Sequence, residues 1–235
     1  MVQSGFSHGD ILYGELIQGA DGNFYGTTFQ GGSGTCLGPF RVIGCGTVFK
    51  VTPSGNQTVL YNFTYDSTTN TAVNGIYPYG GLVQGRDGNF YGTTSSGGNA
   101  GAVCNGTLGC GVVFKITPTG RYTVLHTFNG AFATPAEGGG PTGRLLLGSD
   151  GSFYGTTTRG GYTADKVANQ GTIFKITPRG AFTTLVSFEG DFNGFADPDL
   201  PYAGLIQAKT AVSAEHLSSA GLRGPARFSN MRAGR

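Results

Sequence analysis

Charged residues are scarce in this chain. Asp, Glu, Lys and Arg make up 12% of its 235 residues, half of the roughly one quarter that is common in globular proteins. We therefore expect no highly charged disordered region. No run of eighteen apolar residues occurs, which excludes a membrane-spanning helix. The first ten residues, MVQSGFSHGD, have neither a basic start nor an apolar stretch, so we expect no signal peptide there.

The net charge of +2 is unevenly distributed along the chain. Residues 1–208 carry 10 Lys and Arg against 12 Asp and Glu, whereas residues 209–235 carry five cations against Glu215 alone. A basic tail of this kind is typical of arms that bind nucleic acid or an anionic surface. The pattern of the tail, described below, argues against that interpretation.

Two segments of the sequence recur three times in a fixed order. The first reads GELIQGADGNFYGTTFQGG at 14–32, GGLVQGRDGNFYGTTSSGG at 80–98 and GRLLLGSDGSFYGTTTRGG at 143–161. The second reads GTVFKVTPSGNQTVLYNF at 46–63, GVVFKITPTGRYTVLHTF at 111–128 and GTIFKITPRGAFTTLVSF at 171–188. The connector between the two segments varies in length and sequence. Constant segments with variable connectors indicate structural units joined by surface loops.

Each unit is predicted to contain four short strands. Asp-Gly separates the apolar runs LIQG and NFYGTT, and this dipeptide favours a hairpin because glycine adopts positive φ readily. Pro53 and Gly55 favour a second turn between TVFKVT and QTVLYNF. Two linked hairpins make a four-stranded antiparallel sheet, and such sheets in tandem predict an all-β, β-propeller-like fold. A solenoid of stacked sheets is the alternative, although it normally has a shorter repeat.

The repeated DGNFYGTT and GTVFKVTP motifs resemble those of the choice-of-anchor tandem-repeat GloVer proteins, which are bacterial multi-repeat proteins. The resemblance covers roughly residues 11–208. It implies a propeller-like fold and an exported protein that a C-terminal anchor holds at the cell surface. It supplies no established catalytic residues.

The repeats divide the chain into segments that we expect to be structural units. These are the end of a preceding repeat at 1–13, three repeats at 14–79, 80–142 and 143–200, the start of a fourth at 201–208, and a non-repeat tail at 209–235. Three complete blades fall short of the four to eight that propellers typically have. We therefore expect an open or partial ring, with missing blades or an oligomer partner needed to close it.

The fourth repeat begins as PYAGLIQA and then stops. One alternative reading frame permits a sequence like DGNFYGTT across Lys209–His216 and one like GTVFK across Pro225–Asn230. We therefore predict that a base was gained or lost near codon 209. On this hypothesis the cations of the tail are not a binding site, and we expect no nucleic-acid partner.

The four cysteines form two local pairs in the connectors, Cys36 with Cys45 and Cys104 with Cys110. The third repeat has no cysteine. We favour two disulfides, which imply an oxidising compartment. Free thiols and a four-cysteine zinc site are the alternatives, and the spacings differ from the C-x2-C pairs that zinc sites favour.

Three residue types recur at one position in every unit, and each has a functional and a structural interpretation. They are Asp21, Asp87 and Asp150; Lys50, Lys115 and Lys175; and Tyr25, Tyr91 and Tyr154. The aspartates are candidates for a calcium ring or for Asp-Gly turns. The lysines would form a cationic ring or cover apolar surface with their stems. The tyrosines would stack on sugars or pack between blades. We favour the structural interpretation each time.

The sequence contains no recognisable catalytic constellation. The nucleophile elbow, the zinc-protease helix motif and the phosphate-binding loop are all missing, and we expect no cofactor and no metal. We therefore expect a non-catalytic, extracellular or cell-surface scaffold whose loops bind a polysaccharide or a protein. A propeller enzyme of lyase or glycoside hydrolase type, acting at the channel mouth, is one alternative, and a gene fragment without function of its own is another.

Overall fold

The computed structural model describes residues 11–36, 44–98, 103–104, 107–130, 137–160, 170–188, 201–207 and 212–214. These residues form β-structure, and no helix occurs among them. The predicted units therefore lie largely inside the described ranges. The predicted end of a preceding repeat does not, because residues 1–10 lie outside them.

Each repeat forms one four-stranded antiparallel sheet. Its strands lie side by side in the order in which they occur along the chain. The first sheet contains β1 (Ile17–Gln18), β2 (Phe24–Thr28), β3 (Thr47–Val51) and β4 (Gln57–Asn62). The second contains β5 (Val83–Gln84), β6 (Phe90–Thr94), β9 (Val112–Ile116) and β10 (Tyr122–Thr127). The third contains β11 (Leu146–Leu147), β12 (Phe153–Thr157), β13 (Thr172–Ile176) and β14 (Phe182–Ser187). The all-β, propeller-like prediction is confirmed.

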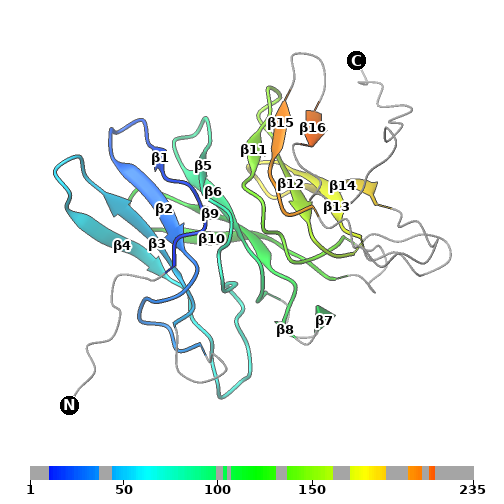
Figure 1. Ribbon diagram of the computed structural model, residues 1–235, viewed down its shortest axis with the longest axis horizontal. Helices are drawn as coiled ribbons and strands as arrows, with labels where there is room; N and C mark the ends of the chain where they lie inside the picture. The colour runs from blue at the N-terminus through cyan, green and yellow to red at the C-terminus, as the bar shows by residue number, and fades with distance from the viewer. Residues whose placement is uncertain are drawn as a thin grey trace.

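The sheets follow one another as blades in an open arc (Figure 1). The first strands β1, β5 and β11 lie toward the centre of the view, and the fourth strands β4 and β14 lie toward its two sides. The short pair β7 (Val103–Cys104) and β8 (Thr107–Leu108) belongs to the connector of the second repeat. The arc is not closed into a ring within the described part of the chain.

The glycine of each FYGTT strand lies opposite the phenylalanine of the FK step in the next strand. The paired residues are Gly26 and Phe49, Gly92 and Phe114, and Gly155 and Phe174. A Cβ atom added at Gly92 would lie 2.7 Å from Phe114 Cζ and 3.0 Å from Leu82 Cδ2. The phenylalanine ring therefore occupies the space above the glycine, which explains why a residue that weakens strands recurs in the middle of one.

The hydrophobic core lies between the blades. One cluster joins Tyr25 and Val48 of the first sheet to Phe90 of the second. A second cluster joins Tyr91 of the second sheet to Phe153 of the third. All five side chains are fully buried. Burial of one such side chain stabilises a fold by about 1.5–3 kcal/mol, so a blade gains most of its stability from its neighbours.

The two-stranded sheet of β15 (Leu205–Gln207) and β16 (Val212–Ala214) begins a fourth unit. Its register places Val212 opposite Gln207, the position that phenylalanine holds in complete units. Only residues 212–214 of the tail 209–235 are described. The predicted reading-frame change therefore concerns residues that lie mostly outside the described ranges.

We predict that Gly92→Ala destabilises the protein by about 1–3 kcal/mol, because the added methyl group overpacks the ring of Phe114. The measurement is the urea midpoint of unfolding. The control is the same substitution in a Phe114→Leu background, where the added methyl has room and its effect shrinks. An unchanged midpoint for Gly92→Ala in the native background would contradict the proposed packing.

Candidate ligand-binding cleft

A tyrosine of the first blade bonds to an aspartate of its own blade and stacks on a phenylalanine of the second. Tyr25 Oη donates a hydrogen bond to Asp21 Oδ2 at 2.6 Å. The Tyr25 ring stacks on Phe90, with the ring centroids 3.9 Å apart. This hydrogen bond lowers the pKa of Asp21, while burial and the same bond raise the pKa of Tyr25 to about 12. The tyrosine therefore stays neutral and the aspartate stays charged over the physiological range.

The second blade repeats this arrangement. Tyr91 Oη donates to Asp87 Oδ2 at 2.7 Å, and the Tyr91 ring stacks on Phe153 at 4.0 Å. Asn89 donates from both its backbone and its side chain to the same carboxylate. Burial alone would raise the pKa of Asp87, but these hydrogen bonds and the nearby charge of Lys115 outweigh burial, so the pKa is lowered.

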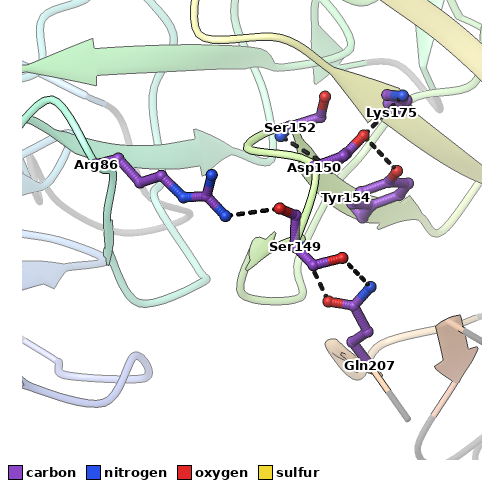
Figure 2. A network of polar contacts seen from close by, with 7 residues as sticks. All are labelled: Arg86, Ser149, Asp150, Ser152, Tyr154, Lys175 and Gln207. Atoms are coloured by element: carbon purple, nitrogen blue, oxygen red, sulfur yellow. Dashed lines mark hydrogen bonds and ion pairs between the residues drawn. The ribbon is translucent and has the colours of Figure 1, made fainter. Parts of the chain in front are cut away.

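The third blade departs from this arrangement, as Figure 2 shows. Ser152 stands where Asn89 stands in the second blade, and the lost amide donor is replaced by Lys175 Nζ, 2.8 Å from Asp150 Oδ2. Burial would raise the pKa of Asp150, but the Lys175 ammonium outweighs it and lowers that pKa. Tyr154 is half-buried and donates to Asp150 at 3.0 Å.

The three lysines are the cross-strand partners of these tyrosines. The pairs are Tyr25 and Lys50, Tyr91 and Lys115, and Tyr154 and Lys175. Among the described residues, an ion pair is formed by Lys175 but not by Lys50 or Lys115. The aspartates lie in the turns between the first and second strands, and each accepts hydrogen bonds within its own blade.

Polar side chains also cross from blade to blade beside these turns. Gln207 of β15 accepts a hydrogen bond from the backbone N–H of Ser149 at 3.0 Å (Figure 2). Gln84 accepts the equivalent bond from the first blade at 2.9 Å. Leu147 is the equivalent residue of the third repeat, and its side chain has no amide group. The second and third blades are linked instead by Arg86, which donates to the carbonyl oxygen of Ser149 at 2.7 Å.

The predicted disulfides are confirmed. Cys36 is bonded to Cys45 and Cys104 to Cys110, and all four side chains are buried. Each bond closes a connector just before the GTVFK-type strand. Two disulfides indicate an oxidising compartment, since cytosolic thiols are normally kept reduced.

His126 has a packing role in the structure. Its ring stacks on Phe182 of the third blade, with centroids 3.8 Å apart and planes within 4° of parallel. Burial lowers the pKa of His126 to about 4, so the imidazole is neutral near pH 7. Its Nε2 lies 3.2 Å from Glu137 Oε2 but without hydrogen-bond geometry. A neutral, stacked ring of this kind is part of the blade interface.

A cleft of about 1000 Å³ lies along the inner edge of the blades, and we call it the inner-strand cleft. It is lined by the segments that lead into β1, β5, β11 and β15 and by residues of the strands β5, β11 and β15 themselves. These segments approach one another closely, because a Cβ atom added at Gly80 would lie 2.8 Å from the carbonyl oxygen of Gly143. Glycine at these positions lets adjacent backbones form the wall of the cleft.

Tyrosines stand at equivalent positions along this cleft. Tyr13, Tyr79 and Tyr202 each precede the glycine-rich start of a repeat, and Thr142 holds the position in the third repeat. Tyr13 is 53% exposed and Tyr202 is 55% exposed. These residues were not predicted as site residues, although their recurrence in YGE, YGG and YAG is visible in the sequence. The tyrosines that were predicted as candidates, such as Tyr25, do not line the cleft.

Two charged side chains line the inner-strand cleft. Arg144 Nη1 of the third repeat lies 3.5 Å from Glu15 Oε2 of the first repeat. The pair spans the second repeat, where Gly81 occupies the equivalent position. Both side chains are exposed, so this ion pair contributes at most about 1 kcal/mol to stability.

The described ranges contain no group of three or more His, Cys, Asp or Glu side chains placed to hold a metal ion. The same ranges contain no helix that is long and apolar enough to cross a membrane. The cleft combines a cavity, exposed aromatic rings and hydrogen-bonding groups.

The blades and the contacts between them define a tandem-repeat protein of propeller type. The chain belongs to the Gloeobacter/Verrucomicrobia repeat family, whose model matches residues 2–214. The resemblance of the motifs to the GloVer repeat proteins is thereby confirmed. No curated protein matches the chain.

Three solved structures share part of the chain's backbone course. They are a luciferin-regenerating enzyme (16% identity, TM-score 0.41, 74% of this chain and 45% of that chain), a protein of unknown function from Dyadobacter fermentans (12%, 0.46, 79% and 57%) and an endo-arabinase from Bacteroides thetaiotaomicron (14%, 0.41, 89% and 64%). The chain thus spans between 45% and 64% of the length of these proteins. Similarity of this degree transfers no activity.

We predict that Asp87→Asn lowers the free energy of unfolding by about 1 kcal/mol at pH 7, because the charged acceptor for Tyr91 and Asn89 is lost. The folded pKa of Asp87 is lowered, so its stabilisation is present above the unfolded value of about 3.9 and is lost as pH falls through the folded pKa. Urea unfolding of both proteins at several pH values tests this. A stability difference that persists undiminished in acid would contradict it.

We predict that replacing Cys104 and Cys110 together by serine destabilises the protein by about 2 kcal/mol, since the disulfide restricts the unfolded chain. The measurement is urea unfolding with and without reductant. Reductant should lower the midpoint of the native protein more than that of the variant, which retains one disulfide. Equal responses to reductant would show that this bond does not stabilise the fold.

Proposed function

We propose that this chain is a non-catalytic binding scaffold of an exported, cell-surface repeat protein. The observation that carries the proposal is the composition of the inner-strand cleft. Exposed tyrosines gather there, and Glu15 is the sole carboxylate among the described residues that line it. A concave surface with a few convergent polar groups is the usual form of a ligand site.

The structural elements around the cleft support a scaffold role. Repeat-equivalent contacts, such as Tyr25 on Phe90 and Tyr91 on Phe153, hold the blades at fixed positions. The segments that differ most between repeats are the connectors, and in the cleft one equivalent position holds Glu15, Gly81 and Arg144 in turn. A rigid framework with variable surface positions suits recognition. The two disulfides support export, since they persist in oxidising compartments.

An enzyme acting at the same cleft is the competing function. Glycoside hydrolysis usually requires a pair of carboxyl groups about 5–10 Å apart. The described lining of the cleft holds Glu15 alone, and its side chain is 82% exposed. Binding without turnover is therefore the function that this geometry favours.

The first and third blades each have a surface suited to packing against a further repeat of the same kind. Phe90 and Phe153 are fully buried under a tyrosine of the preceding blade, whereas the equivalent Phe24 is only partly buried. Tyr154 is likewise half-buried, whereas Tyr25 and Tyr91 are fully buried. Additional blades, or a second copy of the chain, would cover these rings.

We predict that the protein binds an extracellular polysaccharide or surface protein and leaves it intact. A bound ligand at 100 times its Kd should raise stability by about 2.7 kcal/mol, seen as a rise in Tm. The measurement is a thermal-shift screen over soluble polysaccharides and purified surface proteins, with the ligand's mass checked after incubation. Binding to nothing in both classes would contradict the scaffold proposal, and a loss of ligand mass would favour the enzyme.

A further inference from the structure

We infer that the inner-strand cleft binds a neutral polysaccharide, with sugar rings packed against Tyr13 and Tyr202. This inference rests on the scaffold function proposed above and names the ligand class of its site. Its basis is the chemistry of the side chains that line the cleft.

The two tyrosines present apolar ring surface with a polar tip. Tyr13 and Tyr202 are each more than half exposed, and both line the cleft. The C–H face of a sugar ring is apolar while its edge carries hydroxyl groups. A tyrosine matches both features, because its ring contacts the face and its hydroxyl reaches the edge.

Tyr13 is held in position by neighbouring rings. It stacks on Tyr79 with ring centroids 4.5 Å apart and planes 11° from parallel. The ring of Phe29 contacts both edge-on, at 5.3 Å from Tyr13 and 4.9 Å from Tyr79. A ring that is already fixed loses little conformational entropy when a ligand binds, which favours affinity.

The polar groups of the cleft suit hydroxyl groups and not an anionic polymer. Arg144 supplies donors and Glu15 supplies acceptors, and the two lie 3.5 Å apart. Their charges cancel, so the described lining has no excess positive charge to attract phosphate or uronate groups. Hydroxyl groups of a sugar both donate and accept, so they can bond to each member of the pair.

The dimensions of the cleft favour a chain over a single sugar. Its volume of about 1000 Å³ is at the upper end of ordinary small-molecule sites. Tyr13, Tyr79 and Tyr202 all line this one cleft, so sugar units bound there would contact rings from different repeats. A cleft of this size has room for several sugar units of a glycan.

The test uses the full chain and affinity electrophoresis in gels that contain one polysaccharide each. The neutral probes are dextran, laminarin, arabinan, xyloglucan and galactomannan, and the anionic probes are alginate and polygalacturonate. We expect retardation by at least one neutral probe, insensitive to added salt. Tyr13→Ala and Tyr202→Ala should each raise Kd by about tenfold or more, whereas Tyr13→Phe should keep most of the affinity.

Val73→Ala is the control variant, because Val73 is 61% exposed and does not line the cleft. It should bind as the native chain does. Unfolding midpoints identify a tyrosine variant that is misfolded. The affinity of the other tyrosine variant then tests the inference.

Each remaining result would overturn the inference. Unchanged affinity in both tyrosine variants would place the glycan elsewhere. Salt-sensitive binding to anionic probes alone would mean a different ligand class. Binding to surface proteins but to no glycan would refute this inference and keep the scaffold proposal, whereas binding to neither would refute both.

Discussion

The stacking of a tyrosine in one blade on a phenylalanine in the next is the contact on which the rest of the structure depends. Tyr25 lies on Phe90 and Tyr91 on Phe153, and each tyrosine hydroxyl is held by an aspartate of its own blade. The buried clusters lie between sheets and not within one. A single blade would expose apolar side chains on both faces, so repeats of this kind are stable only in series.

The inner-strand cleft is a consequence of the same packing. Blades that are held this closely bring the segments before their first strands together, and only glycine fits where backbones approach as Gly80 approaches Gly143. Small residues then leave the neighbouring positions, 13, 79 and 202, as the places where large side chains can project into the cleft. The fold thus requires glycine at some positions of the inner segments and leaves others open to change, which is why Thr142 can stand where other repeats have tyrosine.

Much of the fold was predictable because its determinants are local. The Asp-Gly turns, the short strands and the paired cysteines are each recognised within about a dozen residues; the turns and strands recur in three copies and the cysteine pair in two. The cleft was not predictable in the same way. The recurrence of Tyr13, Tyr79 and Tyr202 is visible in the sequence, but their exposure depends on how four different repeats meet at the inner edge. The pairing of Lys175 with Asp150 likewise follows from the cross-strand register beside Tyr154.

The sequence alone therefore determined the repeat, the four-stranded sheet of each unit and the antiparallel order of its strands, because each follows from turn chemistry and short-range spacing. It favoured the two disulfides, which the structure shows. The tertiary structure decided which repeated aromatic residues are buried and which face the cleft. That distinction arises between blades, from contacts such as Tyr25 on Phe90 and from the approach of Glu15 to Arg144 across a whole repeat. Tyr25 and Phe90 are 65 positions apart in the sequence and Glu15 and Arg144 are 129 positions apart, and no local pattern specifies the distance between them.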